Sequence, residues 1–438
     1  MEKNLDFINE PTKKALLKMF LPMMAGMLLN LAYNIVDSLW VGNLLGDTAL
    51  AALANATPIV TLIFGFGMGV TSGMAILLSQ VVAGKEKTKE EEIVSSTLLY
   101  TVIISLIMVA VIEILLGNIL EWMHAQPETV DIAGEYLTIY ILGLIPSYIF
   151  CHLTAMLRCY GDSIFQMNSM LISSVLNAFL DPILIGQIGF AGAATATVFS
   201  QVVSLAVLIF YCRKKGYFHI SIKSMKAGLI APVSKLSVPT VIQQCAPSLS
   251  STVLTACVNG FGIAAMAGYE VVGKLDMLLY FPPMVLNMVL TPIIGYCVGG
   301  RRQDRAKDYV RFSIKLSLAL TGIFGILLLL FAGEVSGIFG CSADAQAVVQ
   351  HCMYFLVGGY MFNAVTQCFM GCINGYGHPA NGMVISILNH IVIRIPFSIW
   401  LSGTVLGLDG IWLTLLLSFV AAFVCALIIN GRVIKNKI

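Results

Sequence analysis

Charged residues are scarce in this chain of 438 residues. Only 11% of the residues are Asp, Glu, Lys or Arg, against about 25% in an ordinary soluble domain. Hydrophobic residues make up 58%, and the mean hydropathy is +0.89. One or two globular cores could not bury that much apolar surface. The composition therefore excludes a soluble protein and indicates an integral membrane protein.

Several patterns that would indicate other functions are also missing. The net charge is only +2 and the basic residues form no single stripe, so we expect no nucleic-acid partner. No GxxxxGK[ST] loop is present, so we expect no nucleotide and no direct use of ATP. The 11 cysteines and 6 histidines show neither metal-ligand nor disulfide spacing. We expect no cofactor.

Helix-length apolar stretches divide the chain into twelve predicted membrane spans. The stretches are about 20 residues or longer, whereas the strands of an outer-membrane barrel alternate over about ten residues. The sequence therefore predicts an all-α polytopic membrane protein. The predicted spans lie near residues 15–41, 49–82, 95–120, 131–157, 165–187, 190–212, 232–258, 265–299, 310–332, 347–373, 381–402 and 408–430.

The basic residues predict the orientation of the spans. With the N-terminus in the cytoplasm, 23 of the 25 Lys and Arg residues fall on the cytoplasmic side. The other two, Lys274 and Arg394, lie within predicted spans. This is the asymmetry of the positive-inside rule, and an odd number of spans would destroy it. We therefore expect a multi-pass protein of the plasma (inner) membrane with both termini in the cytoplasm.

The two halves of the chain repeat with an offset of 216 residues. NLLGDTA at Asn43 recurs as NGFGIAA at Asn259, VAGKEK at Val82 recurs as VGGRRQ at Val298, and CYGDS recurs loosely as GYGHP. Because each half holds an even number of spans, both halves enter the membrane from the same side and the repeat is parallel. The predicted domains are an N-lobe of six spans at 1–213, a cytoplasmic linker at 214–235 and a C-lobe of six spans at 236–438.

Asp37 and Asp181 are the acidic residues that most strongly indicate a site. Each lies about five residues from the outer end of its span, and no basic residue lies within a span of the first half. Two carboxylates at one depth in a medium of low dielectric constant must either hold a proton or share a bound cation. The sequence therefore predicts a cation-coupling site. Further polar side chains flank the two aspartates within about two helical turns: Asn30, Tyr33, Asn34 and Asn177.

The alternative for this pair stays open. Both aspartates could serve only as helix caps or hydrogen-bond backbone groups near Pro182 and the ends of their spans.

The second half carries four ionisable residues within its spans. Glu270, Lys274 and Asp276 lie on the eighth span and Arg394 on the eleventh, and their charges sum to zero. Glu270 and Lys274 have the favourable i, i+4 spacing. Asp276 and Arg394 lie at similar depths and suit a pair between helices. We interpret the four as a structural or gating cluster that neutralises itself, although ionisable residues in a membrane are functional by default.

These features resemble the multidrug and toxic compound extrusion (MATE) family. The segments that carry the resemblance are LPMMAGMLLNLAYNIVDSLWVGNLLGDTALAA, SQVVAGKEK after the second span, RCYGD after the fourth and LNAFLDP in the fifth. The resemblance covers nearly the whole chain. It implies a V-shaped pair of six-helix bundles that exports organic, often cationic, compounds in exchange for protons or sodium ions.

The resemblance also implies roles for individual residues. The N-lobe cation site of the family matches Asp37, Asn177, Asp181, Ala193 and Thr197. No metal is expected apart from a Na⁺ at this site, and its oxygen-bearing side chains suit Na⁺ and H⁺ equally.

The substrate cavity is expected to draw on both halves of the chain. One branch of the family carries acidic residues on the seventh and tenth spans, where this chain has uncharged Gln243, Gln244 and Asn363. The chain is therefore similar to the branch that couples through the N-lobe alone. The residues expected to line the cavity are Met27, Asn30, Tyr33, Asn34, Tyr136, Tyr140, Gln243, Gln244 and Asn363.

The sequence thus predicts a cation-coupled multidrug antiporter that works by alternating access, and not an enzyme. Expected partners are small organic, often cationic, substrates and the lipid bilayer, and we expect a monomer. Two alternatives remain. A flippase for lipid-linked oligosaccharides, from the same superfamily, would line its cavity with cations, for which only Lys274 and Arg394 could serve. A polytopic membrane enzyme would need a polar catalytic cluster at a membrane face, and the sequence contains none.

Overall fold

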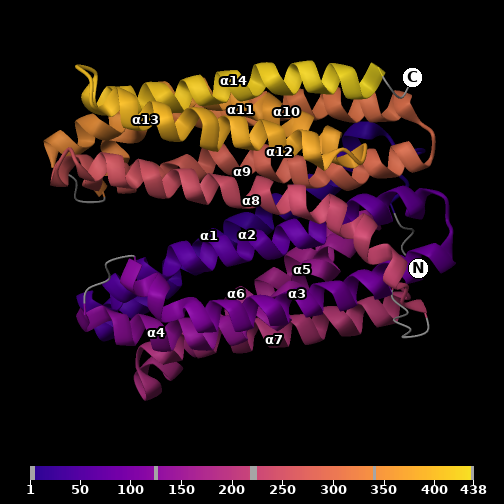
Figure 1. Ribbon diagram of the computed structural model, residues 1–438, viewed down its shortest axis with the longest axis horizontal. Helices are drawn as coiled ribbons and strands as arrows, with labels where there is room; N and C mark the ends of the chain where they lie inside the picture. Colours follow the sequence, from indigo (N-terminus) through magenta and orange to yellow (C-terminus); the bar gives the residue numbers. More distant parts are fainter. Residues whose placement is uncertain (1–4, 123–126, 218–223, 339–341, 436–438) are drawn as a thin grey trace. The chain divides into compact units, whose positions relative to one another are not determined.

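Long helices account for nearly all of the residues that the computed structural model describes, which are 5–122, 127–217, 224–338 and 342–435 (Figure 1). The chain divides into two units. Unit 1 comprises Met1–Leu5 and Leu17–Val241, and unit 2 comprises Asp6–Leu16 and Ile242–Ile438. The sequence analysis assigns residues 1–213 to one lobe, whereas the structure groups Asp6–Leu16 with the second half of the chain.

Unit 1 contains the first seven helices, apart from the start of α1 up to Leu16. They are α1 (Thr12–Leu45), α2 (Asp47–Ala83), α3 (Lys87–Trp122), α4 (Pro127–Leu142), α5 (Leu144–Cys159), α6 (Ser163–Ile188) and α7 (Phe190–Lys215). Part of the predicted linker follows, of which residues 218–223 lie outside the described residues.

The remaining helices belong mainly to unit 2. After the short 3₁₀ turn η2 (Ala227–Leu229), they are α8 (Ile230–Asn259), α9 (Ile263–Gly299), α10 (Gln303–Ile338), α11 (Ala343–Gly375), α12 (Pro379–Ile387), the π-helix η3 (Leu388–Arg394), α13 (Ile395–Ser402) and α14 (Gly407–Lys435).

Eleven of the twelve expected membrane spans are found among the described helices by length and apolarity, and α8 is the remaining helix. Ten helical segments are long and apolar enough to cross a membrane, and one of them is the continuous run α12–η3–α13. The pair α4 and α5, bent by 46°, makes an eleventh. Pro146 lies one turn after the bend and has no N–H to donate to the carbonyl of Leu142. Helix α8 is the twelfth, and Lys235, Gln243 and Gln244 make it less apolar than the others. The predicted all-α, twelve-helix, two-lobe fold is confirmed.

The internal repeat is visible in the helix boundaries. Helices α2 and α9 begin and end 216 residues apart, and so do α3 and α10. Turns also recur with the same backbone conformation, since φ is positive at Gly46 and Gly262 and at Lys85 and Arg301. The two halves therefore fold through the same turns, as expected of a parallel duplication.

The glycine-rich GFGMG segment of α2 allows close helix packing. A Cβ atom on Gly69 would lie 2.4 Å from Cα of Val241 on α8, and one on Gly73 would lie 2.2 Å from Oγ of Ser237. Thr240 uses this proximity and donates from Oγ1 to the carbonyl oxygen of Gly69 at 2.7 Å. The segment thus brings two helix backbones together, as glycines do in membranes.

Residues before the first span are anchored to unit 2 by Phe7. The Phe7 side chain is fully buried, and its ring meets that of Tyr296 edge-on at 5.3 Å. The hydroxyl of Tyr309 donates to the carbonyl oxygen of Phe7 at 2.9 Å, and Arg305 donates to the carbonyl oxygen of Glu10. These contacts explain why Asp6–Leu16 groups with unit 2.

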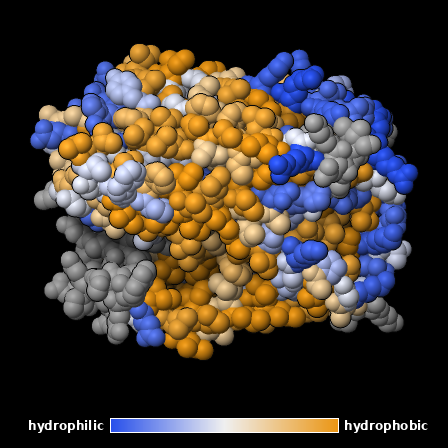
Figure 2. Space-filling model, turned by 45° about the horizontal axis from the view of Figure 1, so that its top comes forward, coloured by the Kyte–Doolittle hydropathy of each residue, from blue (hydrophilic) through white to orange (hydrophobic). Residues whose placement is uncertain are grey.

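Hydrophobic side chains cover the middle of the helices, and hydrophilic ones gather towards their ends (Figure 2). Large apolar residues such as Ile114, Phe179 and Phe210 are more than two-thirds exposed. Exposure on this scale is unfavourable in water and suits contact with lipid.

Candidate functional site

Three helices of unit 1 bring the predicted coupling residues together. Asp37 lies on α1, Asn177 and Asp181 lie one turn apart on α6, and Thr197 lies on α7; all four side chains are buried. Nδ2 of Asn177 donates to Oδ1 of Asp181 at 3.0 Å and to Oγ1 of Thr197 at 3.3 Å. Ala193 is also buried, one turn before Thr197.

The turn between α6 and α7 explains how these helices approach so closely. Gly189 ends α6 and begins α7 with a φ of +66°, a conformation that favours glycine. A Cβ atom on Gly192 would lie 2.3 Å from the carbonyl oxygen of Leu184, so the first turn of α7 packs directly on the last turn of α6. This tight turn places Thr197 beside Asn177.

The two aspartates form a carboxyl pair without a basic partner. Asp37 is 6% exposed and Asp181 0% exposed, and their carboxyl groups are close enough to interact through a shared proton. No basic side chain in the described part of the chain forms an ion pair with either of them. Two ionised carboxylates side by side in an apolar medium repel each other strongly. A proton or a bound cation is therefore needed to neutralise the pair.

Several oxygen atoms around the pair have unused acceptor capacity. Oδ1 of Asp37, Oδ2 of Asp181 and Oδ1 of Asn177 are buried and accept no hydrogen bond from an amide or hydroxyl group of any described residue. Unsatisfied buried acceptors cost about 1–3 kcal/mol each. Oxygen-only ligands of this kind suit a proton or a hard cation such as Na⁺.

Aromatic and polar residues border the carboxyl pair. Oη of Tyr33 lies 2.9 Å from Oγ1 of Thr197 and so joins α1 to α7. Tyr136 stacks on Tyr140 with ring centroids 6.1 Å apart and on Phe190 at 4.7 Å. The predicted tyrosines thus lie together on the α1, α4 and α7 side of the site.

Gln201 is a polar residue of this region that the sequence analysis missed. It lies on α7 one turn after Thr197, accepts a hydrogen bond from Ser147 on α5 and interacts with the hydroxyl of Tyr140. The signal that could have identified it is a glutamine within an apolar span, in helical register with Thr197.

The other predicted residues of α1 lie on or near its exposed side. Asn30 and Asn34 are exposed, and Nδ2 of Asn34 donates to the backbone carbonyl of Asn30 at 2.7 Å and to its Oδ1 at 3.2 Å. Met27 is half-buried one turn before.

The predicted cavity residues of unit 2 have different surroundings. Gln243 on α8 is buried; it donates to the carbonyl oxygen of Pro379 at 2.8 Å and accepts from Nδ2 of Asn374 at 3.1 Å. Gln243 therefore connects α8 to the α11–α12 turn. Gln244 is half-buried, and Asn363 is buried on α11.

The four charges of unit 2 separate into two exposed and two enclosed residues. Glu270 and Lys274 are exposed on α9. Arg394 is 9% exposed, donates to Oγ of Ser418 at 3.1 and 3.2 Å and lies 4.8 Å above the ring of Phe419. Asp276 interacts electrostatically with Arg394, but the ion pairs of the described residues do not include one between them.

The segment around Arg394 corresponds to the segment around Asp181. At the offset of 216 residues Arg394 corresponds to Ala178, three residues before Asp181, and the π-helix η3 ends at Arg394. Where unit 1 carries the carboxylate of Asp181 next to its proline, unit 2 carries a guanidinium two residues before Pro396.

Comparisons with known proteins agree with the repeat. The MatE family model matches residues 22–183 and 239–400. The probable multidrug resistance protein YoeA of Bacillus subtilis is 25% identical over 421 residues, which cover 93% of this chain and 90% of that protein. A protein of Shewanella oneidensis named FAD transporter is 24% identical over 420 residues, covering 93% and 92%.

A solved structure of a MOP superfamily transporter from Pyrococcus furiosus superposes on the chain with a TM-score of 0.93. It covers 100% of this chain and 99% of that chain at 22% sequence identity. At this identity the likeness is one of fold.

Proposed function

The chain belongs to the MatE family of multidrug and toxic compound extrusion transporters, and from this premise we propose that it exports small organic compounds in exchange for H⁺ or Na⁺. It is a transporter and not an enzyme. The observation that carries the proposal of cation exchange is the Asp37–Asp181 pair, which is buried and has no basic partner among the described ion pairs.

The residues that would hold the transported cation are Asp37, Asn177, Asp181 and Thr197. Their buried oxygen atoms include three acceptors that no described amide or hydroxyl group satisfies. A positive charge there removes the repulsion between the carboxylates. Coupling then requires that the cation binds one facing state of the transporter more tightly and that the substrate binds the other more tightly. A ligand with equal affinity for both states would not shift the equilibrium between them.

In unit 1, a change in the charge of the site would act mainly on the position of helix α1. It carries Asp37, and its Tyr33 reaches Thr197 on α7. A change in the charge of the carboxyl pair alters the energy of keeping Asp37 beside Asp181. The position of α1 against α6 and α7 would change with it, and this is how export could be linked to cation entry.

The substrate class follows from the side chains near the site and from the names of relatives. Half-buried Tyr140, which stacks on buried Tyr136, and half-buried Met27 offer aromatic and polarizable surface, which suits flat organic cations. Exposed Asn30 and Asn34 add hydrogen-bonding groups. YoeA is named a probable multidrug resistance protein. We therefore propose varied organic compounds, often cationic, as substrates.

An anionic substrate is the second candidate, because the FAD transporter of Shewanella oneidensis is a relative and Arg394 lies within a span. Against it, the guanidinium of Arg394 already donates to Ser418 and Asn389. A lipid-linked oligosaccharide, the alternative that the sequence leaves open, meets the same objection.

Efflux of ethidium from proteoliposomes tests the proposal. An imposed proton gradient and an imposed sodium gradient are compared for the wild-type chain and for Asp37→Asn and Asp181→Asn. We expect one gradient to drive efflux and both substitutions to abolish it. Asp409→Asn, which changes an exposed aspartate at the start of α14, is the control and should behave as wild type.

Either of two results would count against the proposal. Efflux that survives both Asp37→Asn and Asp181→Asn would place coupling elsewhere. If folded wild-type protein moves ethidium with neither gradient, organic-cation export is wrong, and a fluorescent anionic substrate should be tried.

We also propose that both termini lie in the cytoplasm and that the chain acts as a monomer. Green fluorescent protein fused after Ile438 is expected to fluoresce, whereas alkaline phosphatase at the same place should be inactive. The reverse result would invert the topology. Light scattering of the purified protein should give a protein mass near 47.3 kDa, the mass of one chain.

A further inference from the structure

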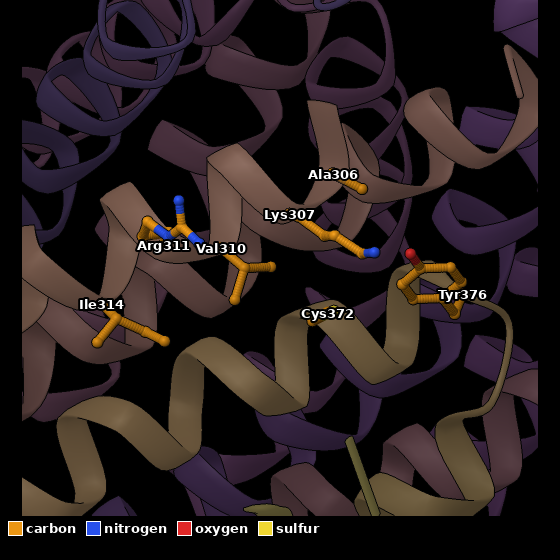
Figure 3. A pocket seen from close by; sticks show the side chains of 7 residues that line it. All are labelled: Ala306, Lys307, Val310, Arg311, Ile314, Cys372 and Tyr376. Carbon is orange, nitrogen blue, oxygen red and sulfur yellow. The ribbon is translucent and has the colours of Figure 1, made fainter. Parts of the chain in front are cut away.

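A pocket of about 240 Å³ lies between α10 and α11 in unit 2 (Figure 3). Lys307 and Arg311, one turn apart on α10, supply its basic groups. Val310, Ile314 and Cys372 supply apolar walls, and Tyr376 closes one end. The pocket therefore combines two cations with an apolar lining.

The two basic residues have no ion-pair partner among the described residues. Lys307 and Arg311 are both exposed. The nearby carboxylate of Asp304 is held by Arg302 at 2.7 Å. In Figure 3 the ammonium group of Lys307 and the hydroxyl group of Tyr376 point toward one another. An anionic group that enters the pocket meets the ammonium group of Lys307 and the guanidinium group of Arg311.

The length of α10 places the pocket at the surface of the bilayer. The apolar span in α10 runs over 35 residues, which is about 52 Å at 1.5 Å per residue. The hydrocarbon core is only about 30 Å thick, so about 20 Å of the helix extends beyond it. Residues 316–333 of α10 carry no charge and suit the hydrocarbon core, so the helix extends beyond it mainly at its start. The basic residues Lys307, Arg311 and Lys315 occupy this start, next to the Arg301–Arg302 turn. Lipid phosphates lie at this level.

The internal repeat shows that the fold does not require these charges. At the offset of 216 residues, Lys307 corresponds to Glu91 and Arg311 to Ser95, while Tyr376 corresponds to Tyr160. The same packing thus accommodates acidic and neutral residues in unit 1. The basic pair in unit 2 is a separate feature of this half.

We propose that the pocket between α10 and α11 binds the phosphate headgroup of an anionic phospholipid. Arginine and lysine donate charge-assisted hydrogen bonds to phosphate oxygens, and basic pockets between membrane helices suit such headgroups. The apolar wall of Val310 and Ile314 would contact the first carbons of the acyl chains. The identity of the leaflet, which would be cytoplasmic, rests on the proposed orientation. Binding itself does not depend on the proposed transport function.

Native mass spectrometry of the intact protein in detergent tests the proposal. Phosphatidylglycerol and zwitterionic phosphatidylcholine of the same chain length are added in turn. We expect wild-type protein to retain one phosphatidylglycerol in preference to phosphatidylcholine. The variant Lys307→Gln/Arg311→Gln should bind it about 30-fold more weakly, because each basic residue near an anionic lipid contributes a factor of about five.

The matched control removes two other basic residues near a helix end. Arg213 and Lys214 are exposed in the last turn of α7 and line no part of the pocket. Arg213→Gln/Lys214→Gln should therefore retain the lipid as wild type does. Arg311→Gln alone, with an expected loss of about fivefold, replaces the double variant if the latter does not fold.

Three results would overturn the proposal. Equal retention of the two lipids by wild-type protein would show that the headgroup charge is not recognised. Unchanged retention by the Lys307→Gln/Arg311→Gln variant would place the lipid elsewhere. Complete displacement of phosphatidylglycerol by millimolar inorganic phosphate would make free phosphate, and not a lipid, the ligand of this pocket.

Discussion

Oη of Tyr33 on α1 lies 2.9 Å from Oγ1 of Thr197 on α7, and the same Oγ1 accepts a hydrogen bond from Asn177 on α6. Asn177 also donates to Asp181, whose carboxyl group is paired with that of Asp37, one turn after Tyr33. The contacts form a closed ring through three helices. A proton or cation that enters the ring therefore acts on the attachment of α1 to α6 and α7 together.

Removal of the Thr197 hydroxyl should weaken this attachment without changing side-chain shape. In Thr197→Val, Tyr33 and Asn177 both lose a buried partner, at a cost of about 1–3 kcal/mol for each unsatisfied group. We expect gradient-driven efflux to fall about tenfold. Thr195→Val is the matched control, because the Thr195 hydroxyl donates only to the carbonyl oxygen of Ala191 on its own helix. Equal efflux by the two variants would show that the ring plays no part in transport.

The carboxyl pair should behave as one unit in both activity and stability. Asp37→Asn or Asp181→Asn removes the repulsion between two buried acids, so we expect the thermal midpoint in detergent at pH 7 to rise by about 2–4 °C, equivalent to ~1 kcal/mol. Efflux should be abolished by either substitution, and the double variant should be no worse than either single variant. A fall in the midpoint of both single variants would indicate that the aspartates act as helix caps or backbone partners instead.

The sequence alone predicted the elements on which this site is built. Apolar run length identified the spans, and the repeat of Gly46 at Gly262 predicted that both halves turn at the same places. Asp37 and Asp181 stood out because acids without a basic partner are costly at membrane depth. These signals are local or arise from composition, and they do not depend on how the helices pack.

Features that depend on how the helices pack could not be predicted from the sequence. The contact of Gln201 with Ser147 joins helices whose rotation depends on the packing of the whole bundle. The anchoring of Phe7 against Tyr296 joins residues far apart in the chain, and Phe7 lies outside the repeat. The pocket beside Arg311 exists only because α10 and α11 leave a space there.

Two glycine substitutions should change the stability of the protein in opposite directions, because Gly69 lies where α2 packs closely on α8 and Gly117 lies in open space on α3. In Gly69→Ala the new methyl group would lie 2.4 Å from Cα of Val241, so the helices must separate; we expect a loss of about 1–3 kcal/mol. In Gly117→Ala on α3 the methyl group meets no atom of the described residues within 4 Å, and better helix propensity should give a gain of up to about 1 kcal/mol. Thermal midpoints of the two purified variants give the comparison. Similar midpoints would mean that α2 and α8 do not pack as closely as described.

The position of Arg394 indicates that the coupling cation does not bind in unit 2. Its guanidinium is a fixed cation in the segment that corresponds to Asp181, with Ser418, Asn389 and the ring of Phe419 as partners. In Arg394→Gln these contacts are lost and Asp276 loses a nearby positive charge, so we expect a loss of about 2 kcal/mol in stability. Because removal of the acid as well relieves part of that loss, the double variant with Asp276→Asn should be more stable than Arg394→Gln alone.

The transport assay separates this structural role from a role in coupling. If unit 1 alone holds the coupling cation, Arg394→Gln lowers the amount of active protein but leaves unchanged which gradient drives efflux. Arg432→Gln, a neutralisation at an exposed position near the end of α14, should change stability by less than about 0.5 kcal/mol and serves as the control. A switch in the driving ion in Arg394→Gln would show that the fixed cation of unit 2 takes part in coupling, since a residue with a purely structural role cannot alter the identity of the exchanged ion.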